Sequence, residues 1–322
     1  MEPRRSLVII ALLISLRSLA GGEPFSFAAL GCLPYGEGSF EDFERVLAEI
    51  DRHRPAFAVH LGDIKGGGEP PTVAHYERVR AAFDAMETPL VYTPGDNEWT
   101  DVIRESNGSQ NQLEWLARIR GMFFEKEESR GRHPMALATQ RRDAGFEKFV
   151  ENARWAHEGV VFATVHVVGS WNNNQPAVGG AIEEFEERDA ANAAWIRATF
   201  ARAREVEALG VVLCFQAAPF AADFNRPGCD RGFEDFLRTI ESEARAFAKP
   251  VLLLHADDHN YHLDERLAFV KGGDPVPNVT RLGVFGDRSR HAVMVVVDPD
   301  RPGLFLCGPL LVPGNMLPAI MK

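Results

Sequence analysis

The stretch Leu90–Asp101, LVYTPGDNEWTD, places a short apolar strand directly before a proline–glycine turn and a run of polar side chains that begins with Asp96 and Asn97. The same pattern occurs upstream as AFAVHLGDIKGGG at 56–68, and downstream as VLLLHADDHNYH at 251–262. An open α/β sheet presents its chemistry beyond the carboxyl ends of its strands. The three stretches therefore predict loops that converge on one polar, cation-binding centre.

Outward from this stretch, strands and helices alternate, which predicts an α/β fold with parallel strands and crossover helices. The expected strands are 25–31, 56–61, 89–93, a pair within 155–168, 210–216 and 250–255, and the expected helices are 40–54, 73–87, 110–124, 182–207 and 231–248. The tail, 279–307, is expected to form a β-meander that closes a second sheet. The charge-rich segment 125–147 lacks periodicity, and we interpret it as a surface insertion or lid within a single domain, 21–322.

The composition is that of a globular protein with an acidic surface. The chain has 322 residues, of which 45% are hydrophobic and 25% are charged, and this is enough for one large domain or two small ones. A formal net charge of −11 argues against a nucleic-acid-binding surface, which would need a basic face.

The first twenty residues have the pattern of a signal peptide. Arg4 and Arg5 precede the apolar run Leu7–Leu16, and small residues that end at Ala20 suit cleavage. The run is shorter than the roughly 20 residues that span a bilayer, and no later segment resembles a membrane span. The pattern predicts a secreted or periplasmic protein, and the alternative is an uncleaved amphipathic anchor, which the late Arg17 favours.

Two groups of residues are candidates for metal binding, and each has a plainer alternative. Asp63, after Gly62, can ligate or bridge cations, or it can cap its strand as an ordinary turn. At the end of the strand 250–255, the residues His255, Asp257, His259 and His262 offer imidazoles and a carboxylate on one side, or they form a solvated polar hairpin.

The remaining signals are weaker. The polar run Asn172–Asn174 can contact the oxygens of a substrate, or it is an ordinary turn. Four scattered cysteines, Cys32, Cys214, Cys229 and Cys307, show no metal-type spacing, and Cys214 and Cys307 lie in apolar runs typical of buried thiols. Asn107 and Asn278 begin triplets that fit the glycosylation pattern.

The order of the blocks resembles the calcineurin-like metallophosphoesterase superfamily over about residues 25–310. In that superfamily the blocks read Asp-x-His, Gly-Asp, Gly-Asn-His-Glu, a single His and Gly-His-x-His. They ligate two metal ions, whose hydroxide attacks a phosphorus in line. The resemblance implies a four-layer β-sandwich of two mixed sheets flanked by helices. The Gly-Asp-Asn-Glu-Trp-Thr block at 95–100 resembles a divergent exported branch.

When each block of the superfamily is matched to this sequence, the resemblance implies a metal centre in which several ligands are replaced. The first block falls on Cys32 and Pro34, which replace an Asp and a His, and the second matches at Asp63. The third places Asp96 at a ligand position and Asn97 where the superfamily has its acidic His. Asn97 cannot supply that acid, so a preference for good leaving groups is expected.

The last two blocks complete the implied ligand set. The fourth falls on Gln216, a neutral ligand, and the fifth on Asp257 and His259. The implied metal ligands are Asp63, Asp96, Gln216, Asp257, His259 and Cys32. As a thiolate Cys32 would favour a softer ion such as zinc, and as a thiol it would be an inert buried group.

The resemblance implies a metal-dependent phosphoesterase that hydrolyses phosphomonoesters or phosphodiesters, small or exported. Asp96 and Asn97 are the expected catalytic residues, and Asn97, Asn172 and Asn174 are the expected substrate contacts. Two divalent ions, of manganese, iron or zinc, are expected if the site is intact. The first alternative is a catalytically impaired pseudoenzyme that acts as a binding module. A second is an unrelated exported sugar- or nucleotide-binding protein.

Overall fold

Strand β1 (Phe25–Leu30) shows why the central strands are continuous apolar runs in the sequence. Its alternate side chains enter two different cores: Phe27 and Ala29 lie in the cluster between the sheets, and Ala28 and Leu30 lie in the cluster beneath the helices. A strand covered on both faces needs apolar residues at every position. The computed structural model describes residues 22–220, 232–269 and 273–316. The predicted signal peptide and Cys229 therefore lie outside the described residues.

The first sheet has five strands in the order β12-β11-β1-β2-β3. Strands β1, β2 (Ala58–His60) and β3 (Leu90–Tyr92) are parallel, whereas β11 (Ala292–Val297) is antiparallel to β1 and β12 (Phe305–Leu310) is antiparallel to β11. The carboxyl ends of β1, β2 and β3 therefore meet at one edge, as the alternation of strands and helices predicts.

The second sheet has seven strands in the order β4-β5-β6-β7-β8-β10-β9. Its strands are β4 (Ala138–Thr139), β5 (Ala153–His157), β6 (Val160–Thr164), β7 (Gly210–Cys214), β8 (Val251–His255), β9 (His262–Glu265) and β10 (Val279–Gly283). Strands β6, β7, β8 and β10 run parallel, and β4, β5 and β9 pair antiparallel at the edges. The predicted β5–β6 pair with its Glu-Gly turn is confirmed.

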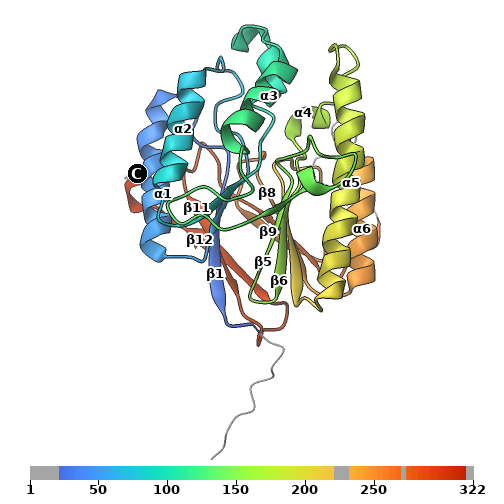
Figure 1. Ribbon diagram of the computed structural model, residues 1–322. Helices are drawn as coiled ribbons and strands as arrows, with labels where there is room; N and C mark the ends of the chain where they lie inside the picture. Colours follow the sequence, from blue (N-terminus) through green and yellow to red (C-terminus); the bar gives the residue numbers. More distant parts are fainter. Residues whose placement is uncertain (1–21, 221–231, 270–272, 317–322) are drawn as a thin grey trace, which may run out of the picture.

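Helices cover the outer face of each sheet (Figure 1). Helices α1 (Phe40–His53), α2 (Val73–Ala85) and α3 (Gln112–Phe123) flank the first sheet, and α5 (Ala181–Glu205) and α6 (Glu234–Phe247) flank the second. The four layers of the predicted sandwich are therefore confirmed. Within the described ranges, no helix is both long and apolar enough to cross a membrane.

The predicted β-meander in the tail is wrong. Strand β10 pairs with β8 in the second sheet, whereas β11 and β12 form a hairpin that joins the first sheet beside β1. Strands that follow one another in sequence are neighbours only about two-thirds of the time. An apolar pattern indicates a strand but does not determine which strand it pairs with. Here the chain crosses from one sheet to the other between β10 and β11.

The segment 125–147 packs along the edges of the sheets. Arg130 exchanges backbone hydrogen bonds with Leu90 at the start of β3, and its guanidinium bonds to Asp84 of α2. Further along, β4 pairs with β5 of the second sheet. Because Leu90 lies at the opposite end of β3 from the turn before Asp96, these contacts hold the segment at the amino end of that strand.

A buried ionic network ties α3 to the second sheet. Glu151 accepts hydrogen bonds from Arg120 at 3.0 and 2.5 Å, and its Oε1 lies 2.7 Å from His166 Nδ1. Burial alone would raise the pKa of Glu151, but the charge of Arg120 and the bond to His166 hold it well below its usual value. Burial also lowers the pKa of His166.

This network should make the protein less stable in acid. The unfolded chain takes up a proton on His166 as the pH falls below about 6.5, and one on Glu151 below about 4.3, before the folded chain does. The raised pKa values of Asp63 and Asp257 act in the opposite direction, so the contribution of this network has to be measured as a difference between two proteins. In urea denaturation, we expect the stability advantage of the wild type over a Glu151→Gln variant to shrink as the pH falls below about 4.3. An advantage that stays constant with pH would contradict this role of Glu151.

Candidate metal centre

The carboxyl ends of strands from both sheets deliver the predicted ligands to one place. Cys32 follows β1, Asp63 follows β2, Asp96 follows β3, Gln216 follows β7, and Asp257 and His259 follow β8. These strands come from chain segments far apart in sequence, and the parallel arrangement brings their ends together. The three converging loops predicted from the sequence are thus the loops that form the centre.

Asp63, Asp96 and Asp257 form a compact group, because one carboxylate oxygen of each lies within 4.8 Å of the others. The amide nitrogen of Gln216 lies among them, 3.2 Å from Asp63 Oδ2, 3.0 Å from Asp96 Oδ1 and 3.1 Å from Asp257 Oδ1. The other end of that amide is fixed, since Oε1 accepts a 2.6 Å bond from Gly169 N–H. In this conformation Gln216 is a hydrogen-bond donor to the carboxylates, and its oxygen is not directed at a cation site.

A second group comprises Cys32, Asp63 and His259, again within 4.8 Å. A residue that sequence reasoning missed, Tyr35, fills the space between two of them. Its hydroxyl lies 3.1 Å from Asp63 Oδ2 and 3.1 Å from His259 Nε2, and it accepts a 2.9 Å bond from Asn97 Nδ2. Tyr35 stands next to Pro34, the position where the resemblance expects a ligand. A phenol one residue further along has therefore taken over this side of the centre.

The backbone around the centre is held in left-handed conformations. Cys32, Asp63, Asp257 and His259 all have positive φ, between 53° and 69°. Such angles are uncommon outside glycine, and they are maintained where the surrounding structure fixes them. Gly95 supplies part of that structure, because a Cβ there would lie 2.1 Å from Asp63 Oδ1. The glycine in the block Gly95–Thr100 is therefore needed for close approach to Asp63.

Two buried acids and one half-buried acid lie together without a countercharge among the described residues. Burial, followed by the charge of Asp96, raises the pKa of both Asp63 and Asp257 well above the usual range. Burial and the nearby Asp63 likewise raise the pKa of Cys32, so the thiol stays neutral. Among the described residues, no lysine or arginine forms an ion pair with Asp63, Asp96 or Asp257. The inert-thiol interpretation of Cys32 agrees with this chemistry.

The loop after β6 brings Ser170 to the centre, beside Asp101 and Arg104 from the loop after β3. Ser170 Oγ lies 2.8 Å from Asp96 Oδ2 and 2.6 Å from Asp101 Oδ1, and it accepts a bond from Arg104 at 3.2 Å. Arg104 also pairs with Asp101 at 2.6 Å, and its side chain is 50% exposed. Burial and the charge of Asp96 raise the pKa of Asp101 to about 7. Arg104 is thus a cation with a solvent-accessible face at the rim of the centre.

This loop is a left-handed turn, labelled α4 (Gly169–Asn172), and a buried arginine of α5 secures it. Four consecutive residues, 170–173, have φ between 48° and 62°. Arg188, which is fully buried, donates to His166 O at 2.9 Å, Asn172 Oδ1 at 2.5 Å and Asn172 O at 2.8 Å, and it pairs with Glu184 at 2.7 Å. These bonds offset the cost of the left-handed backbone.

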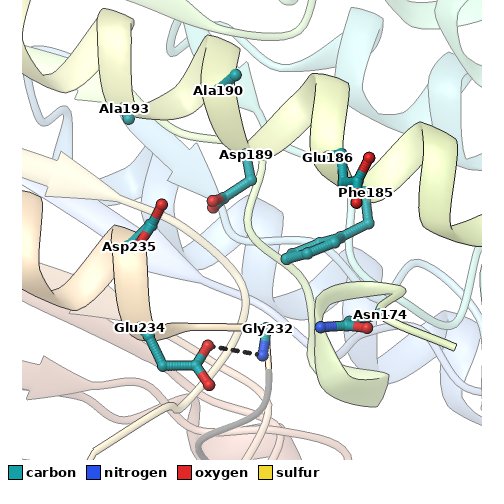
Figure 2. Close-up of a pocket in the computed structure, with 9 residues that line it drawn as sticks. All are labelled: Asn174, Phe185, Glu186, Asp189, Ala190, Ala193, Gly232, Glu234 and Asp235. Atoms are coloured by element: carbon teal, nitrogen blue, oxygen red, sulfur yellow. Dashed lines mark hydrogen bonds between the residues drawn. The ribbon is translucent and has the colours of Figure 1, made fainter.

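The predicted substrate contacts occupy three different environments. Asn97 lies at the centre, with its backbone N–H donating to Asp63 Oδ1 at 3.2 Å. Asn172 is fully buried, and its amide bonds to Arg188 and to Gly232 O, so it holds the loop and is not available to a substrate. Asn174 lines a separate pocket of about 400 Å³ between α5 and α6 (Figure 2).

That pocket does not suit a phosphoester. Its charged lining is acidic, contributed by Glu186, Asp189, Glu234 and Asp235 (Figure 2). Burial raises the pKa of Asp189 to about 6, which still leaves an anionic wall at neutral pH. An anionic substrate would be repelled there. The contact predicted for Asn174 therefore stays a prediction.

The expectation that His255, Asp257, His259 and His262 share one side is wrong. Asp257 and His259 face Asp63, whereas His255 and His262 group with Asp258. The positive φ of Asp257 and His259 turns the chain at each of these residues, so the alternation of an extended strand does not continue past β8.

The glycosylation pattern at Asn107 is also a chance match. Asn107 is fully buried, and its amide bonds to Gly67 O at 2.8 Å, to Asp101 O at 3.0 Å and to Lys65 Nζ at 3.0 Å. Its role is to join the loop after β2 to the loop after β3.

Comparison with known proteins identifies the family and the fold. A family model for calcineurin-like phosphoesterases matches residues 25–193, more than half of the 322-residue chain. No curated protein sequence matches the chain. The solved structure of PhoD is similar, with a TM-score of 0.55 and 13% identity over 87% of this chain and 65% of PhoD.

Purple acid phosphatase PPD1 from yellow lupin (Lupinus luteus) seeds is also similar, with a TM-score of 0.55 and 10% identity over 92% of this chain and 53% of that protein. The chain thus spans less than two thirds of either protein. At these identities the likeness shows a shared fold.

Proposed function

The chain belongs to the calcineurin-like phosphoesterase family, and from this premise we propose that it hydrolyses phosphoester bonds at a centre that holds one divalent cation. Asp63, Asp96 and Asp257 would hold the ion. The observation that carries the proposal is the group of three carboxylates within 4.8 Å, of which Asp63 and Asp96 are buried and Asp257 is half-buried. None of them forms an ion pair with a described lysine or arginine. Buried charges need a paired cation or a metal ion, and an all-oxygen set suits manganese or another hard to borderline ion.

A single ion follows from Tyr35. The second ion of the superfamily would need Cys32, Asp63 and His259, but the Tyr35 hydroxyl is hydrogen-bonded to both Asp63 and His259. Burial and the nearby Asp63 raise the pKa of Tyr35 far above its usual value, so the phenol stays protonated and cannot act as an anionic ligand. The hydrogen bonds of Tyr35 thus take the place of a second metal site.

The bound ion would supply Lewis-acid stabilisation of a phosphoryl oxygen and activation of water. The residues of the chain provide the rest. Arg104 presents guanidinium N–H groups at the rim, where they can bind phosphate oxygens. Gln216 and Ser170 hold the carboxylates in position through the bonds given above. Asn97 orients the Tyr35 hydroxyl and lies beside Gly67, close to Arg104.

The pseudoenzyme alternative is favoured by one observation, the Gln216 amide nitrogen among the three carboxylates. A neutral amide has two protons for three acceptors, and it neutralises no charge. It can therefore orient the carboxylates without replacing a cation.

We propose catalysis as the function. An assay of the purified protein against aryl phosphates, with added manganese, zinc or iron, tests this proposal. Absence of turnover with every ion would favour a binding module.

We also propose that the protein acts outside the cytoplasm on a small or exported phosphoester. The support is the basic start and apolar run of residues 1–20. Fusion of these residues to a reporter that is active only after export tests this proposal. Retention of the reporter in the cytoplasm would contradict it.

Catalysis should depend steeply on the leaving group. Asn97 occupies the position of the acidic His of the superfamily and cannot protonate a departing alkoxide. General-acid help is worth about 10²–10⁴ in rate. We expect nitrophenyl phosphate to be hydrolysed about 10² to 10⁴ times faster than an alkyl phosphate of similar size, as measured by kcat/KM. Equal rates would show that another group supplies the proton.

Arg104 should act mainly through substrate affinity. A hydrogen bond to a charged group contributes about 1.5–3 kcal/mol, so Arg104→Ala should raise KM about 10- to 100-fold with a smaller change in kcat. Arg104→Lys should recover part of this, because it retains the charge. Arg52→Ala, which removes an exposed arginine of α1, is the matched control and should leave KM unchanged. An unchanged KM in Arg104→Ala would remove Arg104 from the site.

A further inference from the structure

A second cluster of metal-ligating side chains lies beside β8, and it shares no residue with the catalytic carboxylates. It comprises His255, the last residue of β8, Asp258, and His262, the first residue of β9. One ligand atom of each lies within 4.8 Å of a ligand atom of the others. His255 is fully buried, and Asp258 and His262 are partly buried.

The hydrogen bonds of the two imidazoles determine what they present to each other. His255 Nδ1 lies 3.0 Å from Ala256 O, and His262 Nδ1 lies 2.9 Å from Asn260 O. A carbonyl oxygen only accepts, so the network assigns the proton of each ring to Nδ1. Each Nε2 therefore carries a lone pair. Both Nε2 atoms are buried and have no hydrogen-bond partner within the described part of the chain.

We propose that His255, Asp258 and His262 bind a divalent ion of the zinc type through two imidazole nitrogens and one carboxylate. The two rings lie with their centroids 5.3 Å apart, and each carries a buried Nε2 lone pair without a partner among the described residues. Such lone pairs call for a cation, a shared proton or a water molecule. The carboxylate of Asp258, whose Oδ2 lies 3.5 Å from His262 Nδ1, adds the negative charge that favours a metal ion. A bond from Nδ1–H to a backbone carbonyl is the outer contact that metal-ligating histidines usually make.

The surroundings fit this assignment. A Cβ at Gly283 would lie 2.3 Å from His262 Cε1, so this glycine of β10 allows the imidazole to lie against the strand. Arg281 of β10 is paired with Asp264 of β9, which reduces its repulsion of an ion at this cluster.

The ion would join the end of β8 to the start of β9 and close the loop between them. That loop carries Asp257 and His259 into the catalytic centre in left-handed conformations. The proposed site therefore has a structural role, because it fixes the loop that positions two groups of the centre.

The test uses the full chain with Asp63→Asn, which removes the ligand shared by both groups of the catalytic centre. Titration with Co²⁺ should show one ion per chain with visible d–d absorption, and X-ray absorption of the zinc form should show nitrogen ligands at about 2.0–2.1 Å. Adding His262→Ala should abolish that binding. Adding His133→Ala, at an exposed histidine, is the control and should not change it.

A second variant guards against misfolding. Gly283→Ala leaves all three ligands present but displaces the His262 ring, and it should weaken Co²⁺ binding at least tenfold with an unchanged circular dichroism spectrum. The proposal is overturned if Asp63→Asn binds no Co²⁺, or if its spectrum is the same with and without His262. Because the catalytic ion is absent from this background, either result leaves the proposed hydrolysis untouched.

Discussion

Replacing Asp63 with asparagine should abolish phosphoester hydrolysis and yet raise the free energy of unfolding of the metal-free protein. Asp63 belongs to both groups of candidate ligands, so its loss removes the ion from the centre. The ion supplies several kcal/mol of transition-state stabilisation, and kcat/KM should fall about 10³-fold or more. Stability should rise because Asp63, a buried carboxylate repelled by Asp96 and Asp257, is removed.

The two effects together distinguish a functional ligand from a structural residue. Steady-state kinetics and urea denaturation in a chelator would measure them on the same samples. Asp300→Asn, at an exposed aspartate, is the control and should change neither. If Asp63→Asn lost activity and also unfolded more easily, Asp63 would be a structural residue and the account of the centre would be wrong.

Among the variants proposed, removal of the Arg188 side chain should cause the largest loss of stability. Arg188→Met leaves Glu184 largely buried without its partner and releases the left-handed loop that carries Ser170. Breaking a buried ion pair on one side costs about 3–5 kcal/mol. We expect a loss of this size in urea denaturation. We also expect activity to fall about 10- to 100-fold, because the loop no longer holds Ser170 against Asp96.

A double variant separates charge from packing. Glu184→Gln combined with Arg188→Met should be more stable than Arg188→Met alone, because no buried charge is left unpaired. Arg204→Met, which breaks a surface pair with Glu243, is the matched control and should cost no more than about 1 kcal/mol. Equal losses in Arg188→Met and Arg204→Met would contradict the role of Arg188 as the anchor of the loop.

The sequence was sufficient for the fold and for the loops that form the centre. Each of the blocks that contain Asp63, Asp96 and Asp257 ends an apolar strand, and parallel strands bring such ends to one edge. That inference needs no knowledge of side-chain direction. It identified the convergence correctly even though several residues of the superfamily pattern are replaced.

The parts of the site that were missed or predicted wrongly depend on the local backbone conformation and on residues outside the motifs. Tyr35 lies one position beyond the expected block, and Ser170 reaches Asp96 only because its loop is left-handed. The split between His259 and His262 arises from positive φ at Asp257 and His259, which spacing alone does not reveal. The bonds by which Asn172 holds its loop could not be foreseen, because an exposed polar loop residue and a buried loop anchor look alike in sequence.

The central claim is that one divalent ion sits among Asp63, Asp96 and Asp257. Elemental analysis of wild-type protein and of Asp63→Asn, both purified without chelators and supplemented with manganese, zinc and iron, tests it most directly. If the ion binds there, the variant holds one ion per chain fewer than the wild type. A difference of two would show that Tyr35 yields to a second ion, and no difference would show that the carboxylates hold none.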